Sequence, residues 1–356
     1  MRPHGGWFVA ALNFRILAQG IVVGAIAISI FFGCTKASDS NGGESPAAKT
    51  SGLTIGLVLD KGGKDDRSFN TAAVVGSSQA AKEFGLTIKD VESPDDTAFE
   101  PALRTFAERG LPLVIAIGFG QADALKKVAP QFPNTKFAIV DAVVEAPNVA
   151  SLMFEEQEGS FLVGYLAGLA TKTNAVGFVG GMEVALIRRF LMAYEAGAKA
   201  ANPKVKVLNN FVGITASAWA NPTRGKELAL SQINQGADVI FHAAGASGMG
   251  VFDAAEEKKV YAIGVDSNQN AIKPGRVLTS MLKRVDTAVY AVIAEVVKGE
   301  FKPGLRSFGL KDKGIDYAVD SNNEAVIAPY KTKLEEVRAQ IISGKIVAPD
   351  YYKSKK

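Results

Sequence analysis

Short apolar segments alternate with longer amphipathic segments along most of the chain, and this alternation limits the possible folds more than any other feature. Residues 53–60 (LTIGLVLD), 111–118 (LPLVIAIG) and 136–143 (KFAIVDAV) are nearly continuous apolar runs, which are typical of strands buried on both faces. Residues 70–85 and 101–110 have helical composition, and each ends in glycine, a common helix terminator. The pattern predicts an α/β fold with a parallel sheet covered by helices on both faces.

The alternation begins again after about residue 158 and continues to about residue 300. Apolar runs at residues 175–181, 237–245 and 260–266 are separated by helical segments. Two halves of similar size predict two doubly wound lobes. Ligands of such sheets bind outside the carboxyl ends of the strands, so the residues at those ends are the first candidates for a site.

Three of the expected strands end at a carboxylate, namely Asp60, Asp141 and Asp266. Two others run into glycine-rich turns, one around Phe119 and one at residues 243–250. Aspartate often caps the next helix or turn, and this remains the alternative for each acid taken alone. Three such ends in one chain favour a binding site.

Aromatic and polar side chains near these strand ends indicate binding chemistry. Phe69 and Trp219 each lie between an expected strand and an expected helix, and two facing rings can sandwich a planar ligand. Asn70 carries a donor and an acceptor that suit the edge of a heterocycle, and Lys283 can donate to a hydroxyl. Packing in the core or at a hinge is the alternative for both rings.

Sequence motifs for catalysis, metals and nucleic acids do not occur. His242 is the only histidine beyond residue 33, and there is no HExxH, P-loop or complete GxGxxG fingerprint. Cys34 is the only cysteine, so no internal disulfide or Cys/His zinc cluster can form. Charged residues make up 21% of the chain and the net charge is +4, unlike the dense basic surface of a nucleic-acid binder. We therefore expect neither an enzyme nor a cofactor.

The N-terminal segment is expected to lie outside the fold. The first 15 residues hold two arginines and no acid, and the next 18 are uncharged, as in a secretory signal. The glycine before Cys34 completes a stretch that resembles the lipobox of bacterial lipoproteins, although Phe31 stands where leucine is usual. We expect a signal peptide over residues 1–33, a lipid anchor on Cys34 that holds the protein at the cell envelope, and a flexible tether over residues 34–52. An uncleaved membrane anchor is the alternative.

Five stretches resemble the basic membrane protein family, bacterial lipoproteins of the purine nucleoside receptor type that act as solute-binding components of ABC transporters. They are GLVLDKGGKDDRSFN, FAIVD, GADVIFHAAGASGMGV, YAIGVDSNQN and VLTSMLKRVD. The resemblance implies the two-lobed fold of type I periplasmic binding proteins, with about three chain crossings at the hinge. It implies an N-terminal lobe of residues 53–151 plus about 278–315, and a C-terminal lobe of residues 152–277 plus about 316–350.

The resemblance also implies a nucleoside in the cleft between the lobes and a permease partner in the membrane. The implied contacts are base stacking by Phe69 and Trp219, base hydrogen bonds from Asn70, Asp60 and Asp141, ribose contacts from Asp266 and Lys283, and close backbone approach at Gly245 and Gly248. Carboxylates favour ligands with N–H donors, hence purines. The alternatives are another planar heterocycle such as a flavin, a ligand sensor or surface interaction protein, and an enzyme such as a nucleoside hydrolase or phosphorylase.

Overall fold

The structure is a computed structural model, and it describes residues 52–354. The expected signal peptide, Cys34 and all of the tether except its last residue lie outside the described residues. Within residues 52–354, no helix has the length and apolar character needed to cross a membrane.

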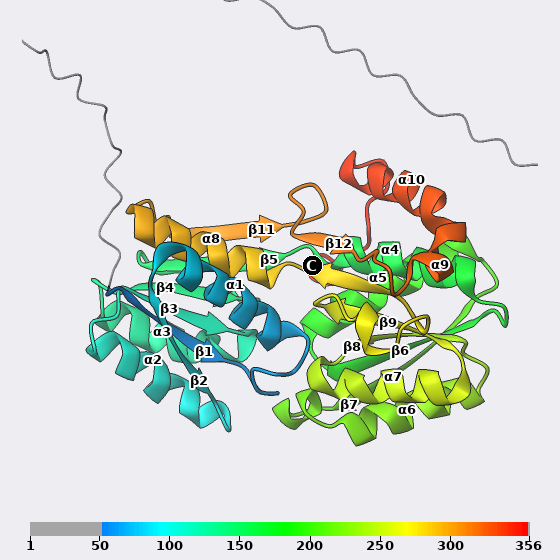
Figure 1. The fold of residues 1–356 in the computed structure, drawn as a ribbon, viewed down its shortest axis with the longest axis horizontal. Coiled ribbons are helices and arrows are strands. Elements are labelled where there is room, and N and C mark those ends of the chain that lie inside the picture. Colours follow the sequence, from blue (N-terminus) through cyan, green and yellow to red (C-terminus); the bar gives the residue numbers. More distant parts are fainter. Residues whose placement is uncertain (1–51, 355–356) are drawn as a thin grey trace, which may run out of the picture. The chain divides into compact units, whose positions relative to one another are not determined.

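The first lobe is built on a six-stranded parallel sheet (Figure 1). Helices α1 and α8 pack together over one face of it, and α2 and α3 cover the other, so the apolar strands are buried on both sides. In spatial order the strands are β11 (Gly304–Phe308), β5 (Val149–Phe154), β4 (Lys136–Val140), β3 (Leu113–Ile117), β1 (Thr54–Leu59) and β2 (Thr87–Glu92). The helices are α1 (Phe69–Phe84), α2 (Phe99–Glu108), α3 (Ala122–Val128) and α8 (Val285–Lys298).

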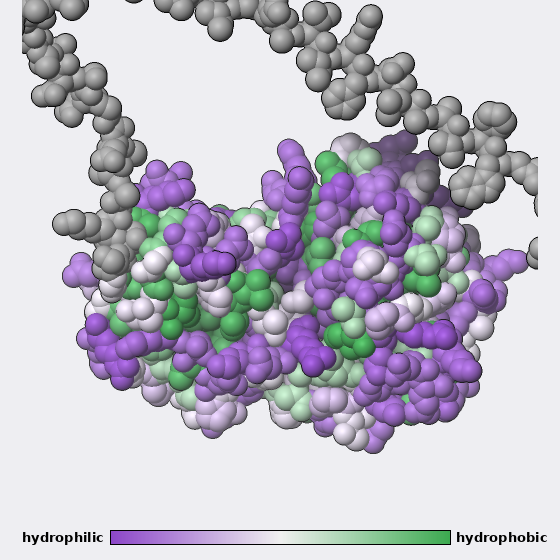
Figure 2. Space-filling model, in the orientation of Figure 1, coloured by the Kyte–Doolittle hydropathy of each residue, from purple (hydrophilic) through white to green (hydrophobic). Residues whose placement is uncertain are grey.

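The second lobe repeats this plan with another six-stranded sheet. Its strands in spatial order are β12 (Ile315–Tyr317), β10 (Val277–Lys283), β9 (Tyr261–Asp266), β8 (Val239–Ala243), β6 (Ala175–Met182) and β7 (Lys206–Gly213). Only β12 is antiparallel to its neighbour among these strands. The helices are α4 (Glu156–Ala170), α5 (Ala185–Ala201), α6 (Pro222–Asn234), α7 (Gly248–Lys258), α9 (Glu324–Ile327) and α10 (Lys331–Ile342). Hydrophilic residues predominate on the outer face of α6 and α7 (Figure 2), as expected for helices with one buried face.

The chain passes between the two sheets three times, after β5, after β10 and between β11 and β12. The expected α/β class with two doubly wound lobes is confirmed. One lobe boundary differs from the expectation, because β10 pairs with β9 and residues 278–283 therefore belong to the second sheet. An apolar run does not reveal which of two buried sheets it joins. Strand β5, which the alternation did not single out, adds a further strand to the first sheet.

Candidate functional site

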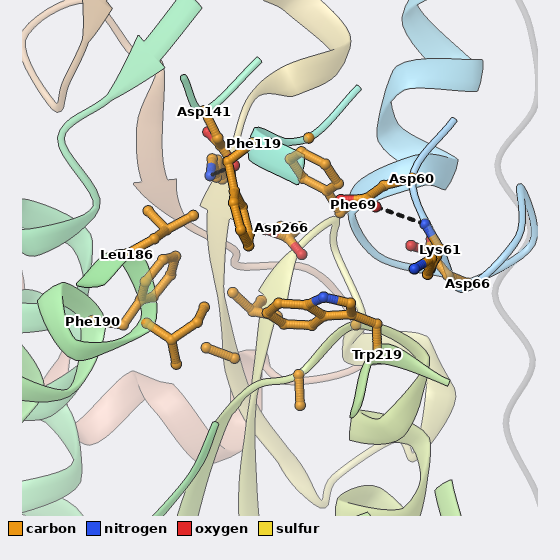
Figure 3. A pocket seen from close by; sticks show the side chains of 17 residues that line it. Asp60, Lys61, Asp66, Phe69, Phe119, Asp141, Leu186, Phe190, Trp219 and Asp266 are labelled. Carbon is orange, nitrogen blue, oxygen red and sulfur yellow. Dashed lines mark hydrogen bonds and ion pairs between the residues drawn. The ribbon is translucent and has the colours of Figure 1, made fainter. Parts of the chain in front are cut away.

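A cleft between the two lobes collects the carboxyl ends of strands from both sheets (Figure 3). Its free space, including the part open to solvent, is about 540 Å³. Seven of the nine predicted ligand-binding residues line it, namely Asp60, Phe69, Asp141, Trp219, Gly245, Asp266 and Lys283. The fold therefore brings together residues from both halves of the sequence.

Asp141 and Asp266 occupy equivalent positions in the two lobes. Asp141 follows β4 and Asp266 ends β9, which are the third strands of their sheets in spatial order. Both have left-handed backbone conformations, with φ of 67° and 63°. Residues other than glycine rarely adopt this conformation, and such strain concentrates at functional sites. The internal repeat thus places two carboxylates in the same cleft.

Lys283 ties the two lobes together at the base of the cleft. Its Nζ lies 2.6 Å from Asp141 Oδ2 and 3.0 Å from the carboxylate of Glu156. It also lies 5.3 Å from the ring centroid of Phe69. Burial alone would lower the pKa of Lys283, but the charges of Asp141 and Glu156 outweigh burial and keep that pKa above its ordinary value. Lys283 is therefore a permanent cation in the cleft.

The cleft carboxylates are poised to accept hydrogen bonds. Burial raises the pKa of Asp60 and that of Asp266 to about 7, and the pKa of Asp141 to about 6. Asp141 Oδ1 is buried and accepts no hydrogen bond from the described residues. A buried acceptor without a donor costs free energy, so a ligand with N–H or O–H donors would stabilise these carboxylates in their ionised form.

Gly118 allows the Asp60 carboxylate to lie at the floor of the cleft. Its φ is 109°, and a Cβ at this position would approach Asp60 Oδ2 to 2.1 Å. The other Asp60 oxygen accepts the Lys61 N–H at 2.8 Å. Any side chain at residue 118 would therefore displace the carboxylate.

Aromatic rings reach into the cleft from both lobes. Phe69 begins α1 in the first lobe, and Trp219 ends a short 3₁₀ helix, Ala216–Trp219, in the second. Figure 3 shows these two rings on opposite sides of the cleft, with the ring of Phe119 beside them. Trp219 packs against Gly181, where a Cβ would come within 2.3 Å of the indole. The arrangement can hold a flat molecule between aromatic faces.

Hydrogen bonds join the two lobes directly beside the cleft. The Ser68 hydroxyl donates to the Asp266 carboxylate, and the Ser267 hydroxyl donates to the Ser68 carbonyl at 2.8 Å. Gln269 Nε2 donates to the Arg67 carbonyl, also at 2.8 Å. These contacts join the loop before α1 to the turn after β9.

Two predicted ligand contacts lie outside the cleft. Asn70 is fully buried, and its amide accepts the Asp60 N–H and donates to the carbonyls of Asp60 and Lys61. It shapes the turn that carries Asp60 and Phe69, and in this structure its amide bonds three backbone groups. Gly248 begins α7 beside His242, whose ring would be 2.0 Å from a Cβ at this position. Its small size serves packing.

Several residues in the cleft or directly behind it were not predicted. Leu186, Ile187 and Phe190 on α5 form an apolar wall, and Glu156 pairs with Lys283. Helix α5 follows β6 as α1 follows β1, so the internal repeat was a signal that pointed to its first turn. No comparable signal marked Glu156, which is one of three acids near the start of α4.

Comparison with known proteins places the chain in a family. A family model described as ABC transporter substrate-binding protein PnrA-like matches residues 54–351. The chain belongs to the Bmp family. Members of the Bmp family are extracytoplasmic substrate-binding proteins and not enzymes, in agreement with the absence of catalytic motifs from this sequence.

Individual relatives span nearly the whole chain. A Lactococcus lactis protein named ABC transporter nucleoside-binding protein BmpA is 33% identical, with 92% of this chain and 98% of the relative covered. A Listeria innocua protein named CD4+ T-cell-stimulating antigen is 36% identical, with coverages of 96% and 98%. The crystal structure of an ABC transporter solute-binding protein from Aeropyrum pernix K1 matches with a TM-score of 0.75 and 30% identity, covering 83% of this chain and 94% of the other.

Proposed function

We propose that this Bmp-family protein captures a purine nucleoside between its two lobes and delivers it to an ABC permease. The observation that carries the proposal is the placement of Phe69 and Trp219 on opposite walls of a cleft whose floor is made of buried carboxylates. The rings suit a planar base, and the carboxylates suit its N–H groups and the sugar hydroxyls. The printed name of the Lactococcus lactis relative supports the same ligand class.

Each part of the ligand has a matching set of groups. Asp60 and the unpaired Oδ1 of Asp141 would accept hydrogen bonds from the base. Asp266 would accept from ribose hydroxyls, and Lys283 would donate to them. Carboxylates outnumber cations in the lining, so a neutral nucleoside fits the charge of the cleft better than a phosphorylated nucleotide.

The proposed mechanism is a hinged clamp anchored at the membrane. In an open form, the nucleoside would stack on one ring. Closure would then add the second ring and the carboxylate of the opposite lobe. The ligand favours closure only by the free energy it gains in the closed form and not in the open one. A lipid on Cys34 and the tether would keep the clamp near its permease.

Native mass spectrometry of the purified protein tests the ligand class. A tight clamp retains its ligand through purification, so we expect an adduct that is released on denaturation as inosine, guanosine or adenosine. Release of a flavin or of another heterocycle would assign the cleft to that molecule and would contradict the proposal. Incubation with a nucleoside should produce no free base.

Nucleoside binding is expected to release protons near neutral pH. With the lobes in contact as in this structure, Asp60 and Asp266 have a pKa of about 7 and are partly protonated at pH 7. Ligand donors stabilise the ionised form and lower both pKa values, so the affinity should increase as pH rises from about 5.5 to 7.5. Calorimetry of inosine binding at pH 7 in phosphate and in Tris should give different apparent enthalpies. Equal enthalpies and a flat pH profile would show that the acids do not act as acceptors.

A further inference from the structure

A row of buried charged side chains extends from the ligand cleft to the C-terminal segment of the chain. Asp141 Oδ2 receives Lys283 Nζ at 2.6 Å, and Lys283 Nζ lies 3.0 Å from Glu156 Oε1. The other Glu156 oxygen receives Arg189 Nη1, also at 2.6 Å. Arg189 Nε in turn donates to Asp350 Oδ1 at 3.0 Å. Acidic and basic side chains alternate along the whole row.

Burial makes the row rigid and its members dependent on one another. No side chain in it is more than 7% exposed. The row holds three carboxylates and two cations, and Glu155 gives Arg189 a further carboxylate at 2.9 Å. Loss of either cation therefore leaves buried carboxylates without their partner, which is costly in a protein interior. Each inner member is held from both sides and can shift only if its neighbours shift as well.

The C-terminal segment closes the far end of the row. After α10 the chain returns to the region between the lobes, where its end lies (Figure 1). Asp350 receives two donors of the guanidinium, Nε at 3.0 Å and Nη2 at 3.2 Å. The Tyr352 ring lies 4.9 Å from the carbon of the same guanidinium, in cation–π range. This segment, residues 350–352, thus fixes Arg189 from the side opposite the cleft.

We propose that Asp350 is a positioning residue for ligand capture, which acts through Arg189, Glu156 and Lys283 on the carboxylate of Asp141. The proposal rests on the proposed function for its ligand. Asp141 presents Oδ1 to the cleft because Oδ2 is held by Lys283, and Lys283 is held in turn by Glu156. Arg189 also donates to the Phe154 carbonyl at 2.6 Å and to Glu155 at 2.9 Å. Without Asp350, Arg189 Nε loses its acceptor and the guanidinium is drawn toward Glu155. Glu156 shifts with it, and Lys283 no longer fixes the direction of Asp141.

A double-mutant cycle on inosine affinity tests this coupling. We expect Asp350→Ala to weaken inosine binding by about tenfold in calorimetry, although Asp350 does not line the cleft. Asp350→Glu should restore the affinity to within about threefold, because it returns a carboxylate to Arg189. In an Asp141→Asn background, Asp350→Ala should have no further effect, whereas a general loss of stability would lower the affinity equally in both backgrounds. Lys345→Ala is the control, because Lys345 is an exposed lysine shortly before the same segment.

A second measurement needs no ligand and separates this proposal from the proposed function. The ¹⁵Nζ resonance of Lys283 should shift in Asp350→Ala and stay in place in Lys345→Ala. If the wild-type protein binds no nucleoside, the proposed function fails, and the Lys283 resonance still decides the positioning role.

Where Asp350→Ala does not fold, Asp350→Asn keeps the side-chain volume and one acceptor, and we expect smaller shifts of the same kind. An unmoved resonance, an affinity within about twofold of wild type, or equal losses in both backgrounds would overturn the proposal.

Discussion

Replacing Lys283 with methionine is expected to lower the free energy of unfolding by about 3–5 kcal/mol and to abolish nucleoside binding. Methionine keeps most of the side-chain length, so the lost packing is small. The substitution leaves Asp141 and Glu156 buried without their shared cation. Urea unfolding followed by circular dichroism measures the effect. Lys127→Met, at an exposed lysine, should change the stability by less than about 0.5 kcal/mol.

The effect of Lys283→Met should depend on pH. Burial already raises the pKa of Asp141 to about 6 against the pull of Lys283, and removal of the cation raises that pKa further. A group whose pKa is higher in the folded than in the unfolded protein contributes stability that is lost as pH rises through the folded pKa. The loss in free energy of unfolding relative to wild type should therefore be larger at pH 8 than at pH 5. An equal loss at both pH values would show that packing, and not charge, accounts for it.

Replacing Asp266 with asparagine is expected to weaken inosine binding roughly 10- to 150-fold, as for loss of a hydrogen bond to a charged group. The amide keeps the volume and can still accept from Ser68, so the fold should survive. Because the proposed partners of Asp266 are ribose hydroxyls, the variant should also lose much of its preference for inosine over 2′-deoxyinosine. Calorimetry with both nucleosides measures each quantity.

The matched control is Asp65→Asn, which neutralises an exposed acid in the loop before α1. It should leave the inosine affinity within about twofold of wild type, because exposed charges contribute little. Wild-type affinity in the Asp266→Asn variant would show that Asp266 does not contact the ligand. An unchanged preference for inosine over 2′-deoxyinosine would show that Asp266 does not contact the ribose 2′-hydroxyl.

The positions at strand ends could be predicted from the sequence because they follow from periodicity alone. Asp60, Asp141 and Asp266 each follow an apolar run, and the sheet topology places all three ends at one cleft. Phe69 and Trp219 followed the same logic, since each lies between a strand and the helix that follows it in the sequence. What periodicity does not contain is the direction of a side chain within such a loop. Asn70 therefore looked like a ligand contact, whereas its amide holds the backbone of Asp60.

The charged row could not be predicted because its members are far apart in sequence. Glu156, Arg189 and Asp350 sit on two helices and the C-terminal segment, and each resembles an ordinary surface charge in its local sequence. They meet where α4 packs against α5 and the C-terminal segment returns to Arg189. For the same reason, the sheet that β10 joins was unclear until its pairing with β9 was known.

Tryptophan fluorescence tests the stacking of a nucleoside between Phe69 and Trp219 most directly. Trp219 is the only tryptophan in the part of the chain that the structure describes, and Trp7 is the only other one in the sequence. Titration with inosine should quench the emission in a saturable way, with the same dissociation constant as calorimetry. Trp219→Phe should retain binding and lose the quenching. Calorimetric binding that leaves the Trp219 emission unchanged, or no binding of any purine nucleoside, would contradict the account.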